Sequence, residues 1–332
     1  MKSKYIVDLS LIGLLILAFL YFQYYIPQSA VKLSQKIDQT GAGSSDSTRM
    51  NISEEYTSYL ARWLPKNPET IPTLGHHYIG QQRKILDIRV EQAISEIKNI
   101  PILDPNIRVW SLLNMGAVIK SPNTIVSIDV ANIPFLSNSH DELAKISDIF
   151  LLTHTDSDHF DQQLLKSALA NNKKIVFLEG VYFEKTKENS QNIFELKSGQ
   201  RTKIKDIFIT AFQTDHRGDG NFDNPNCWYL IEIGKTTILH TGDGLAFKNP
   251  TESESLRSRS DIDIMLSNIM LSAKNIEEIN PKVVVPLHLF KYIHGREQLS
   301  DSTFEIIKNK YEQIKPSKNK IIYLFAGEGF LY

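Results

Sequence analysis

The chain has 332 residues, of which 42% are hydrophobic and 23% are charged, and its formal net charge is -1. This composition is that of a globular protein able to bury a core. The balance of 37 Lys and Arg against 38 Asp and Glu predicts no large basic surface, so no nucleic-acid partner is expected. The single cysteine, Cys227, excludes an intrachain disulfide and a cysteine-rich zinc cluster, so any metal must be held by histidines and carboxylates.

The first element along the chain is an apolar segment, Leu9 to Ile26. As a helix it would span roughly 27 Å, which is close to the thickness of a bilayer core. Lys2 and Lys4 precede it, and this favours an N-terminus in the cytoplasm with the rest of the chain outside. Residues 1–30 are therefore predicted to be a single-pass membrane anchor. The alternative is a signal peptide whose cleavage releases a secreted or periplasmic protein, but Gln28 occupies a position where cleavage requires a small residue.

Two segments connect this anchor to the main domain. Residues 31–50 are polar and end in a run rich in Gly and Ser, which predicts a flexible linker. Residues 51–100 carry apolar side chains at helical spacing in two stretches, Ser53 to Trp63 and Gln81 to Ile100. We therefore expect a helical extension that packs on the main domain, residues 101–332.

The main domain alternates short strands with helices. One helix is predicted at Gln162 to Ala170. The predicted strands are Ile107 to Lys120, Thr124 to Val130, Ile149 to Thr153, Lys174 to Leu178, Ile207 to Gln213, Trp228 to Ile233, Thr236 to His240, Ile262 to Leu266, Val283 to Leu287 and Ile321 to Phe325. This order fits a mixed α/β sandwich better than a single doubly wound sheet.

Four potential metal ligands follow the predicted strand at 149–153 within six residues: His154, Asp156, Asp158 and His159. A loop between a strand and a helix can direct several side chains at one point while both flanking elements stay rigid. The two aspartates repel each other unless a cation lies between them. The alternative, a carboxylate of Asp158 or Asp161 that caps the next helix, accounts for one aspartate but for neither histidine.

Three further ligand-type residues each lie at or just past the C-terminal end of a predicted strand: His216, Asp243 and His288. Each alone has an ordinary explanation, as a loop residue or as a core histidine with a hydrogen-bond partner. Together with the His-Asp loop, they predict a metal site assembled from four separate stretches of chain.

This order of residues resembles the signature of the metallo-β-lactamase superfamily: a His-x-His-x-Asp-His loop, a His, a Gly-Asp turn and a His after an apolar strand. The successive gaps from His159 to His216, to Asp243 and to His288 are 57, 27 and 45 residues. Asn114-Met115-Gly116 and Ile128-Asp129-Val130 are similar to the opening strands of that superfamily. Within it, the chain is most similar to the branch with ascorbate-6-phosphate lactonase-like and phospholipase-D-type members.

The resemblance implies a four-layer αββα sandwich that binds two divalent metal ions. One ion would be held by His154, Asp156 and His216, the other by Asp158, His159 and His288, with Asp243 bridging them. It further implies a hydrolase in which a metal-bound hydroxide attacks an ester-type bond, a phosphodiester or a lactone, of a small molecule or a lipid. Asp158 and His216 are the residues whose loss is expected to abolish activity. Asp215 and His240 are candidates for partners that orient the ligands.

One position departs from the signature, since Asp156 stands where most family members have His. Zinc remains the first choice because it accepts a carboxylate oxygen, but the harder ligand improves the prospects of manganese or iron. Flavodiiron proteins also place a carboxylate here, so a di-iron redox protein is an alternative, although no Gly-rich cofactor loop is evident. A non-catalytic binding module is a further alternative, against which the seven ligand-type residues argue. A membrane tether favours a lipid substrate by location only.

Overall fold

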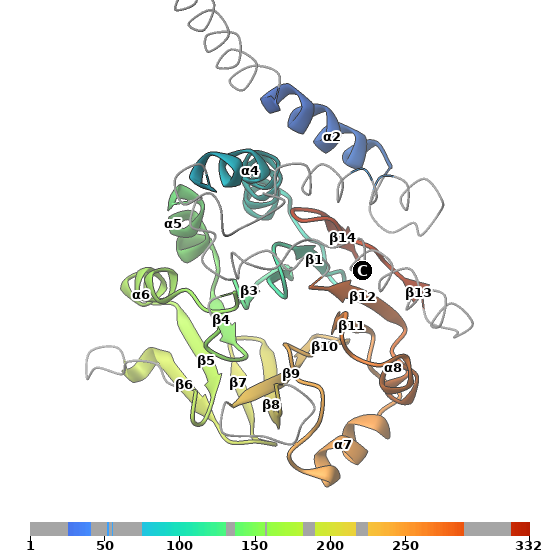
Figure 1. The fold of residues 1–332 in the computed structure, drawn as a ribbon. Coiled ribbons are helices and arrows are strands. Elements are labelled where there is room, and N and C mark those ends of the chain that lie inside the picture. The colour runs from blue at the N-terminus through green and yellow to red at the C-terminus, as the bar shows by residue number, and fades with distance from the viewer. Residues whose placement is uncertain are drawn as a thin grey trace, which may run out of the picture.

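The computed structural model describes residues 26–40, 52, 55, 75–130, 137–156, 158–181, 190–216, 225–288 and 320–332. Its centre consists of two seven-stranded sheets, with helices on either side (Figure 1). Among the helices of these residues, none is both long and apolar enough to cross a bilayer. The predicted anchor segment, 9–26, lies outside the described residues except for its last position, so it stays a prediction.

The first sheet combines an antiparallel half with a parallel half. Its strands are, in spatial order, β14 (Gly329–Leu331), β1 (Arg108–Ser111), β2 (Ala117–Lys120), β3 (Ile125–Ile128), β4 (Ile149–Leu152), β5 (Lys174–Leu178) and β6 (Ile193–Leu196). Strands β3 to β6 are mutually parallel. The carboxyl ends of β3 and β4 therefore meet at one edge of the sheet, where ligand-carrying loops are expected in α/β folds.

The second sheet repeats this arrangement. Its order is β13 (Lys320–Ile321), β12 (Val283–Leu287), β11 (Ile264–Asn268), β10 (Thr236–His240), β9 (Asn226–Ile233), β8 (Ile207–Thr214) and β7 (Arg201–Ile204). Strands β10 to β13 are parallel, and β9 is antiparallel to both β8 and β10. As a result, β8, β10, β11 and β12 all end at the same edge.

Alternation along β9 shows how the layers pack. Cys227, Tyr229 and Ile231 belong to the core between the two sheets, whereas Trp228 and Leu230 belong to a second core on the opposite face. Successive residues of a strand point to opposite faces, so both faces of this sheet are covered. The second core includes residues of two helices, α7 (Pro250–Arg257) and α8 (Ala273–Ile279).

Three helices pack beside the first sheet: α4 (Gly75–Asn99), α5 (Ser137–Ile146) and α6 (Gln162–Ala170) (Figure 1). The apolar faces of these helices contribute to the first core, for example through Val90, Leu143 and Leu164. The order of layers is thus helix, sheet, sheet, helix, which is the arrangement expected for the metallo-β-lactamase type of fold.

Many predicted elements agree with the structure, but the single strand expected at 107–120 does not. It is a hairpin in which β1 and β2 are joined by a turn at 112–116. Asn114 has φ 51°, a backbone conformation that Asn tolerates better than most residues, and Gly116 N donates to Leu113 O. Because the turn residues are buried like those of the strands, the hydrophobic pattern did not reveal it.

Other boundaries shift more modestly. The helix at 162–170 and the strands at 174–178, 236–240 and 283–287 are confirmed with unchanged bounds. The strand expected at 321–325 is reduced to the two residues of β13, and the strands β6, β7 and β14 were not predicted. Polar edge strands such as β7 lack the apolar run by which a buried strand is recognised.

The flexible linker predicted at 31–50 is wrong for residues 31–40, which belong to helix α2 (Ile26–Thr40). Ala30, Leu33 and Ile37 are buried, and their spacing of three and four residues gives α2 one apolar face against the domain. Residues 41–50 lie outside the described residues. The helix expected at 81–100 is confirmed as part of α4, whereas nearly all of the stretch 53–63 lies outside the described residues.

Arg89 of α4 connects α2 to the C-terminal part of the chain. Its side chain is almost fully buried, and its Nε donates to Ala326 O at 3.1 Å. Its guanidinium also donates to Ser34 Oγ at 3.2 Å and forms an ion pair with Asp38. A buried guanidinium is tolerated only when its donors are satisfied, so these contacts fix α2 on the domain.

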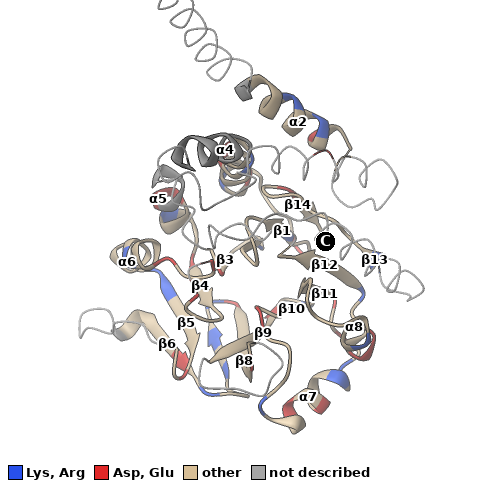
Figure 2. Ribbon diagram, viewed as in Figure 1, with Lys and Arg blue, Asp and Glu red and all other residues tan. Residues whose placement is uncertain are grey.

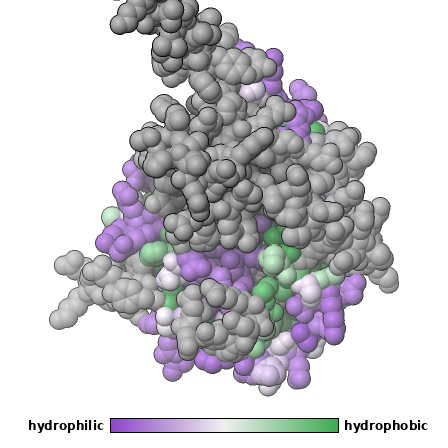
Figure 3. All heavy atoms as spheres, viewed as in Figure 1, coloured by the Kyte–Doolittle hydropathy of each residue, from purple (hydrophilic) through white to green (hydrophobic). Residues whose placement is uncertain are grey.

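Charged residues of both signs are spread over the described helices, strands and loops (Figure 2). On the face shown in Figure 3, hydrophilic residues occupy the middle of the molecule and hydrophobic residues lie beside them. The absence of a nucleic-acid partner stays a prediction.

Candidate metal centre

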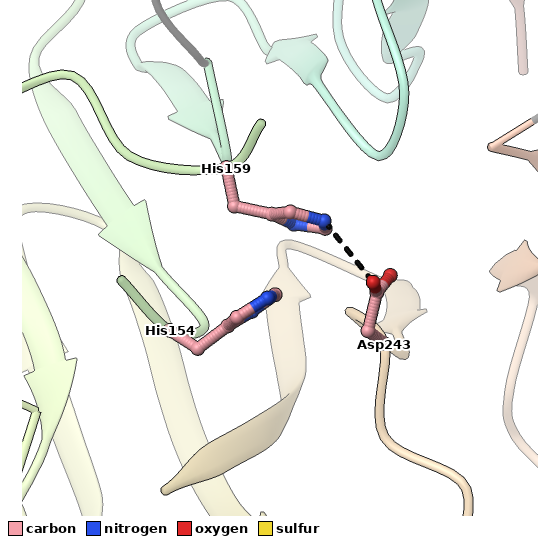
Figure 4. Close-up of side chains that lie close together, drawn as sticks. All are labelled: His154, His159 and Asp243. Carbon is pink, nitrogen blue, oxygen red and sulfur yellow. Dashed lines mark ion pairs between the residues drawn. The ribbon is translucent and has the colours of Figure 1, made fainter. Parts of the chain in front are cut away.

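All seven predicted ligands lie at the edge where the strands of both sheets end. The loop after β4 provides His154, Asp156, Asp158 and His159, while His216 follows β8, Asp243 follows β10 and His288 follows β12. His154 and His159 approach from the first sheet, and Asp243 faces them from the second (Figure 4). Because β8, β10 and β12 run in the same direction, His216, Asp243 and His288 meet at this edge although they span 72 positions of the chain.

The side chains form two groups around separate carboxylates. Asp156 Oδ2 lies 3.7 Å from His154 Nε2 and 3.2 Å from His216 Nε2. Asp158 Oδ2 lies 3.7 Å from His159 Nε2 and 3.4 Å from His288 Nε2. Within each group the potential ligand atoms are all within 4.8 Å of one another. These two groups are the two ligand sets that the resemblance implied.

Asp243 lies between the groups. Its Oδ2 is 3.3 Å from His159 Nε2, 3.6 Å from His216 Nε2 and 3.9 Å from His288 Nε2. One oxygen therefore faces imidazoles of both groups, as a bridging ligand requires.

The histidine nitrogens at this centre fit a metal better than they fit the protein alone. The Nε2 atoms of His154, His159, His216 and His288 are buried and have no hydrogen-bond partner. Buried polar atoms without a partner cost about 1–3 kcal/mol each, so four in one place require an explanation. Two cations, one in each group, would satisfy all four. Imidazole and carboxylate ligands without a thiolate suit zinc, manganese and iron.

Asp129, at the end of β3, fixes the protonation of two of these imidazoles. Its Oδ2 accepts from His159 Nδ1 at 3.0 Å and from Thr153 Oγ1 at 2.6 Å. Thr153 Oγ1 in turn lies 2.9 Å from His154 Nδ1. Since the Thr153 hydroxyl donates to Asp129, it accepts from His154. In both histidines Nδ1 is thus engaged as a donor, and Nε2 is the nitrogen directed at the centre.

The sequence contained a signal for Asp129, the Ile-Asp strand end, but gave no role for it. Asn114 likewise belonged to a motif, Asn114-Met115-Gly116, but was given no role, and Asn268 was missed. Asn268 Nδ2 donates to Asp243 Oδ1 at 2.6 Å, and Asn114 Nδ2 approaches Asp158 Oδ2 at 3.5 Å. Amide side chains at the ends of strands are common, so no pattern in the sequence separates Asn268 from other asparagines.

Two backbone features place ligands at the centre. Gly242 has φ +49°, and a Cβ there would lie 2.9 Å from the side chain of Thr153, so the turn that carries Asp243 can approach β4 only with glycine. His288 has φ 60°, and its N–H donates to Asn114 O at 2.8 Å. A histidine in this sparsely populated conformation is held by its surroundings, a condition found often at functional sites.

Asp215 and His240, the predicted orienting partners, both form hydrogen bonds with backbone groups. His240 Nε2 donates to Met115 O at 2.9 Å, and its Nδ1 accepts from Gly242 N at 3.2 Å. Asp215 Oδ1 accepts from Ala246 N at 2.9 Å. Both therefore shape the loop that carries Asp243, whereas the tautomers of His154 and His159 are set by Asp129.

The capping alternative applies to Asp161 alone. Its Oδ1 accepts from Gln163 N at 2.8 Å and from Leu164 N at 3.0 Å, at the N-terminus of α6. Asp158 faces His159 and His288 instead.

The electrostatics of the cluster show how closely these charges interact. Burial alone would lower the pKa of His159, but the carboxylates of Asp243 and Asp129 outweigh it and hold that pKa well above its usual value. Burial lowers the pKa of His154. The neighbouring imidazoles of His154 and His216 hold the pKa of Asp156 far below its usual range. Titratable groups shifted in opposite directions within one cluster are typical of functional sites.

Comparison with known proteins supports the same assignment. Residues 118–288, just over half of the chain, match the family described as "Beta-lactamase superfamily domain". The chain belongs to the beta-lactamase superfamily. The resemblance to its metallo-β-lactamase members is thereby confirmed, while the branch within the superfamily stays a prediction. None of the curated proteins matches the chain.

Two solved structures are similar in fold to this chain. Igni18, described as a novel metallo hydrolase from the archaeon Ignicoccus hospitalis, is 14% identical, with a TM-score of 0.50 over 68% of this chain and 98% of that one. CmlA, described as a diiron beta-hydroxylase from Streptomyces venezuelae, is 11% identical, with a TM-score of 0.51 over 70% of this chain and 55% of that one. At these identities the likeness concerns the fold alone.

Proposed function

We propose that this chain is a metal-dependent hydrolase that cleaves an ester-type bond, a phosphodiester or a lactone, in a small molecule or a lipid. The observation that carries the proposal is the convergence of four unpartnered imidazole nitrogens with three carboxylates at one edge of the sandwich. The family match and the metallo-hydrolase fold support hydrolysis in general.

The ligand assignment follows the two groups of side chains. His154, Asp156 and His216 would hold one ion, and Asp158, His159 and His288 the other, with Asp243 shared. Two divalent ions at such a centre lower the pKa of a water molecule toward neutrality and polarise the carbonyl or phosphoryl group under attack.

The chain's own residues prepare the centre for this chemistry. Asp129 and Thr153 engage Nδ1 of His159 and His154, so Nε2 is the atom that each imidazole directs at the metal position. Asp156 belongs to one ligand group and Asp158 to the other, so each ion position would have a carboxylate of its own in addition to Asp243. Among the described residues we assign no serine or cysteine nucleophile, and Cys227 is fully buried.

We propose zinc as the resident metal, with manganese and iron as alternatives favoured by Asp156. In that position Asp156 supplies a hard oxygen ligand to the His154 and His216 group. Metal analysis of the purified protein distinguishes these ions.

A di-iron redox protein is the second candidate, favoured by the same Asp156 carboxylate. CmlA, which shares the fold, is itself described as a diiron beta-hydroxylase. Iron in the purified protein, with a visible absorption band and no hydrolysis of esters, would replace the hydrolase proposal by this one.

The direct test is hydrolysis of bis(p-nitrophenyl) phosphate and of simple lactones by the metal-loaded protein. We expect turnover of at least one substrate class, its loss with a chelator and its return with added zinc or manganese. A protein that binds metal but hydrolyses neither class would favour a non-catalytic binding module. A preference for lactones or for phosphodiesters would also test the proposed branch of the superfamily.

We further propose that residues 1–30 anchor the chain in a membrane and that the hydrolase domain faces the extracytoplasmic side. The apolar segment and its flanking lysines support this proposal. Membrane fractionation of the full chain, followed by protease treatment of intact cells, tests both the anchor and its orientation. Recovery in the soluble fraction with an intact N-terminus would contradict it.

A further inference from the structure

The two carboxylate oxygens of Asp243 have different surroundings. Oδ2 faces His159, His216 and His288 at 3.3, 3.6 and 3.9 Å from their Nε2 atoms. Oδ1 accepts a hydrogen bond from Asn268 Nδ2 at 2.6 Å. One oxygen is therefore directed at both ligand groups, and the other is occupied by an amide.

Asn268 is held in one orientation. It is the last residue of β11 and only 3% exposed. Its Oδ1 accepts from Met270 N at 2.7 Å, so its NH2 group must point the other way, toward Asp243. Its own N–H donates to Thr241 Oγ1 at 2.9 Å, which ties the end of β11 to the loop that carries Asp243.

We propose that Asn268 is a positioning residue that fixes the carboxylate of Asp243 with Oδ2 directed at both ligand groups. This inference rests on the proposed metal centre. Because Asn268 donates to Oδ1, that oxygen is occupied, and Oδ2 is the oxygen that would be available to metal ions in both groups.

The consequence concerns the strength with which the second ion binds. A carboxylate shared by two ions would affect both the binding of the second ion and the coupling between them. Residues that orient ligands of a metal typically contribute about 10–100-fold to metal affinity. Asn268 is therefore expected to act mainly on the binding of the second ion and on the magnetic coupling between the two.

Asn268→Asp separates this role from a merely structural one. The new side chain has the same shape and can still accept from Met270 N, but it cannot donate to Asp243 as a carboxylate. Asn275→Asp is the matched control, because it adds the same charge on α8, where the backbone N–H of Asn275 bonds to the cap residue Ser272. Asn268→Ala removes the donor without adding charge and serves if the Asp variant fails to fold.

The experiment uses metal-free protein titrated with Mn²⁺, with affinities from calorimetry and electron paramagnetic resonance spectra at one and two equivalents. We expect the wild type and Asn275→Asp to bind two coupled ions. In Asn268→Asp and Asn268→Ala, we expect the second ion to bind about 10–100-fold more weakly, with altered coupling. Unchanged second-site affinity and coupling in both Asn268 variants would overturn the inference while leaving the metal centre intact. A wild type that binds no metal would instead refute the proposed function, and with it the basis of this inference.

Discussion

His159 donates from Nδ1 to Asp129 Oδ2 over 3.0 Å, and both side chains are buried. The carboxylate thus fixes the imidazole with its Nε2 directed at the metal centre. Through Thr153 the same carboxylate reaches His154. A single residue at the end of β3 therefore prepares one ligand in each of the two groups.

The first prediction concerns Asp129→Asn, which keeps the shape of the side chain but removes its charge. We expect metal affinity to fall by about 10–100-fold, because the tautomers of His154 and His159 are no longer enforced. Calorimetric titration of metal-free protein measures the change. Circular dichroism checks that the fold is retained. Wild-type affinity in a folded variant would remove Asp129 from the centre.

The second prediction concerns Asp158→Ala and His216→Ala, one ligand from each group. Each should abolish hydrolysis while the domain remains folded, because each removes a contact with one ion but no part of the core. Activity assays and metal analysis of both variants test this. A matched control is Asp261→Ala, an exposed carboxylate paired with Arg259. Full activity in either ligand variant would discard the site.

The third prediction is that removal of metal lowers stability. A metal ion that binds only the folded state stabilises it by about 2.7 kcal/mol when present at 100 times its dissociation constant. For a domain of this size each kcal/mol shifts the melting temperature by about 2–4 °C. We therefore expect chelator to lower the melting temperature by roughly 5–10 °C, and added zinc or manganese to restore it. Equal melting curves with and without chelator would argue against bound metal.

The fourth prediction concerns pH and Cys227. Burial raises the pKa of this thiol, so the folded protein keeps a proton that the unfolded chain loses above about pH 8.5. Stability should then decrease as pH rises, by at most about 1.4 kcal/mol per pH unit from this one group. Urea unfolding of the wild type and Cys227→Ala at pH 7.5 and 9.5 tests the sign. The variant should lose less stability over this interval, and an equal loss would contradict the prediction.

The fifth prediction concerns Arg89, which joins α2, α4 and the C-terminal segment. Asp38→Ala leaves the buried guanidinium without its carboxylate, and removing one partner of a buried pair costs about 3–5 kcal/mol. Because Asp38 itself is partly exposed, we expect an effect on the order of 2 kcal/mol here. Urea unfolding measures it, with Lys36→Ala on the exposed face of α2 as control. An Asp38 variant as stable as the control would show that the ion pair does not hold α2.

Much of the architecture was readable from local patterns. The strands β4, β5, β10 and β12 correspond to apolar runs that are bounded by polar residues. Such a run can be recognised within a few residues of sequence, so these strands could be predicted. The four ligands of the 154–159 loop could be selected because two histidines and two aspartates within six positions are unusual in a purely structural loop. The other three could be selected because each lies at or just past the end of a predicted strand. Local patterns failed at residues 112–116, because the residues of that turn are as buried as those of the strands on either side. They also failed at residues 31–40, because this mostly polar segment has apolar residues on one face of a helix.

The sequence by itself determined the ligand types, their order and the class of fold, because these depend on residue chemistry and on spacing along the chain. Only the tertiary structure showed that Asp129 orients His159 and that Asn268 occupies one oxygen of Asp243. These partners lie 30 and 25 positions apart in the chain. Their contact depends on the pairing register of neighbouring strands and on the direction in which each strand ends. Those are properties of the assembled sheets, and no single segment carries them.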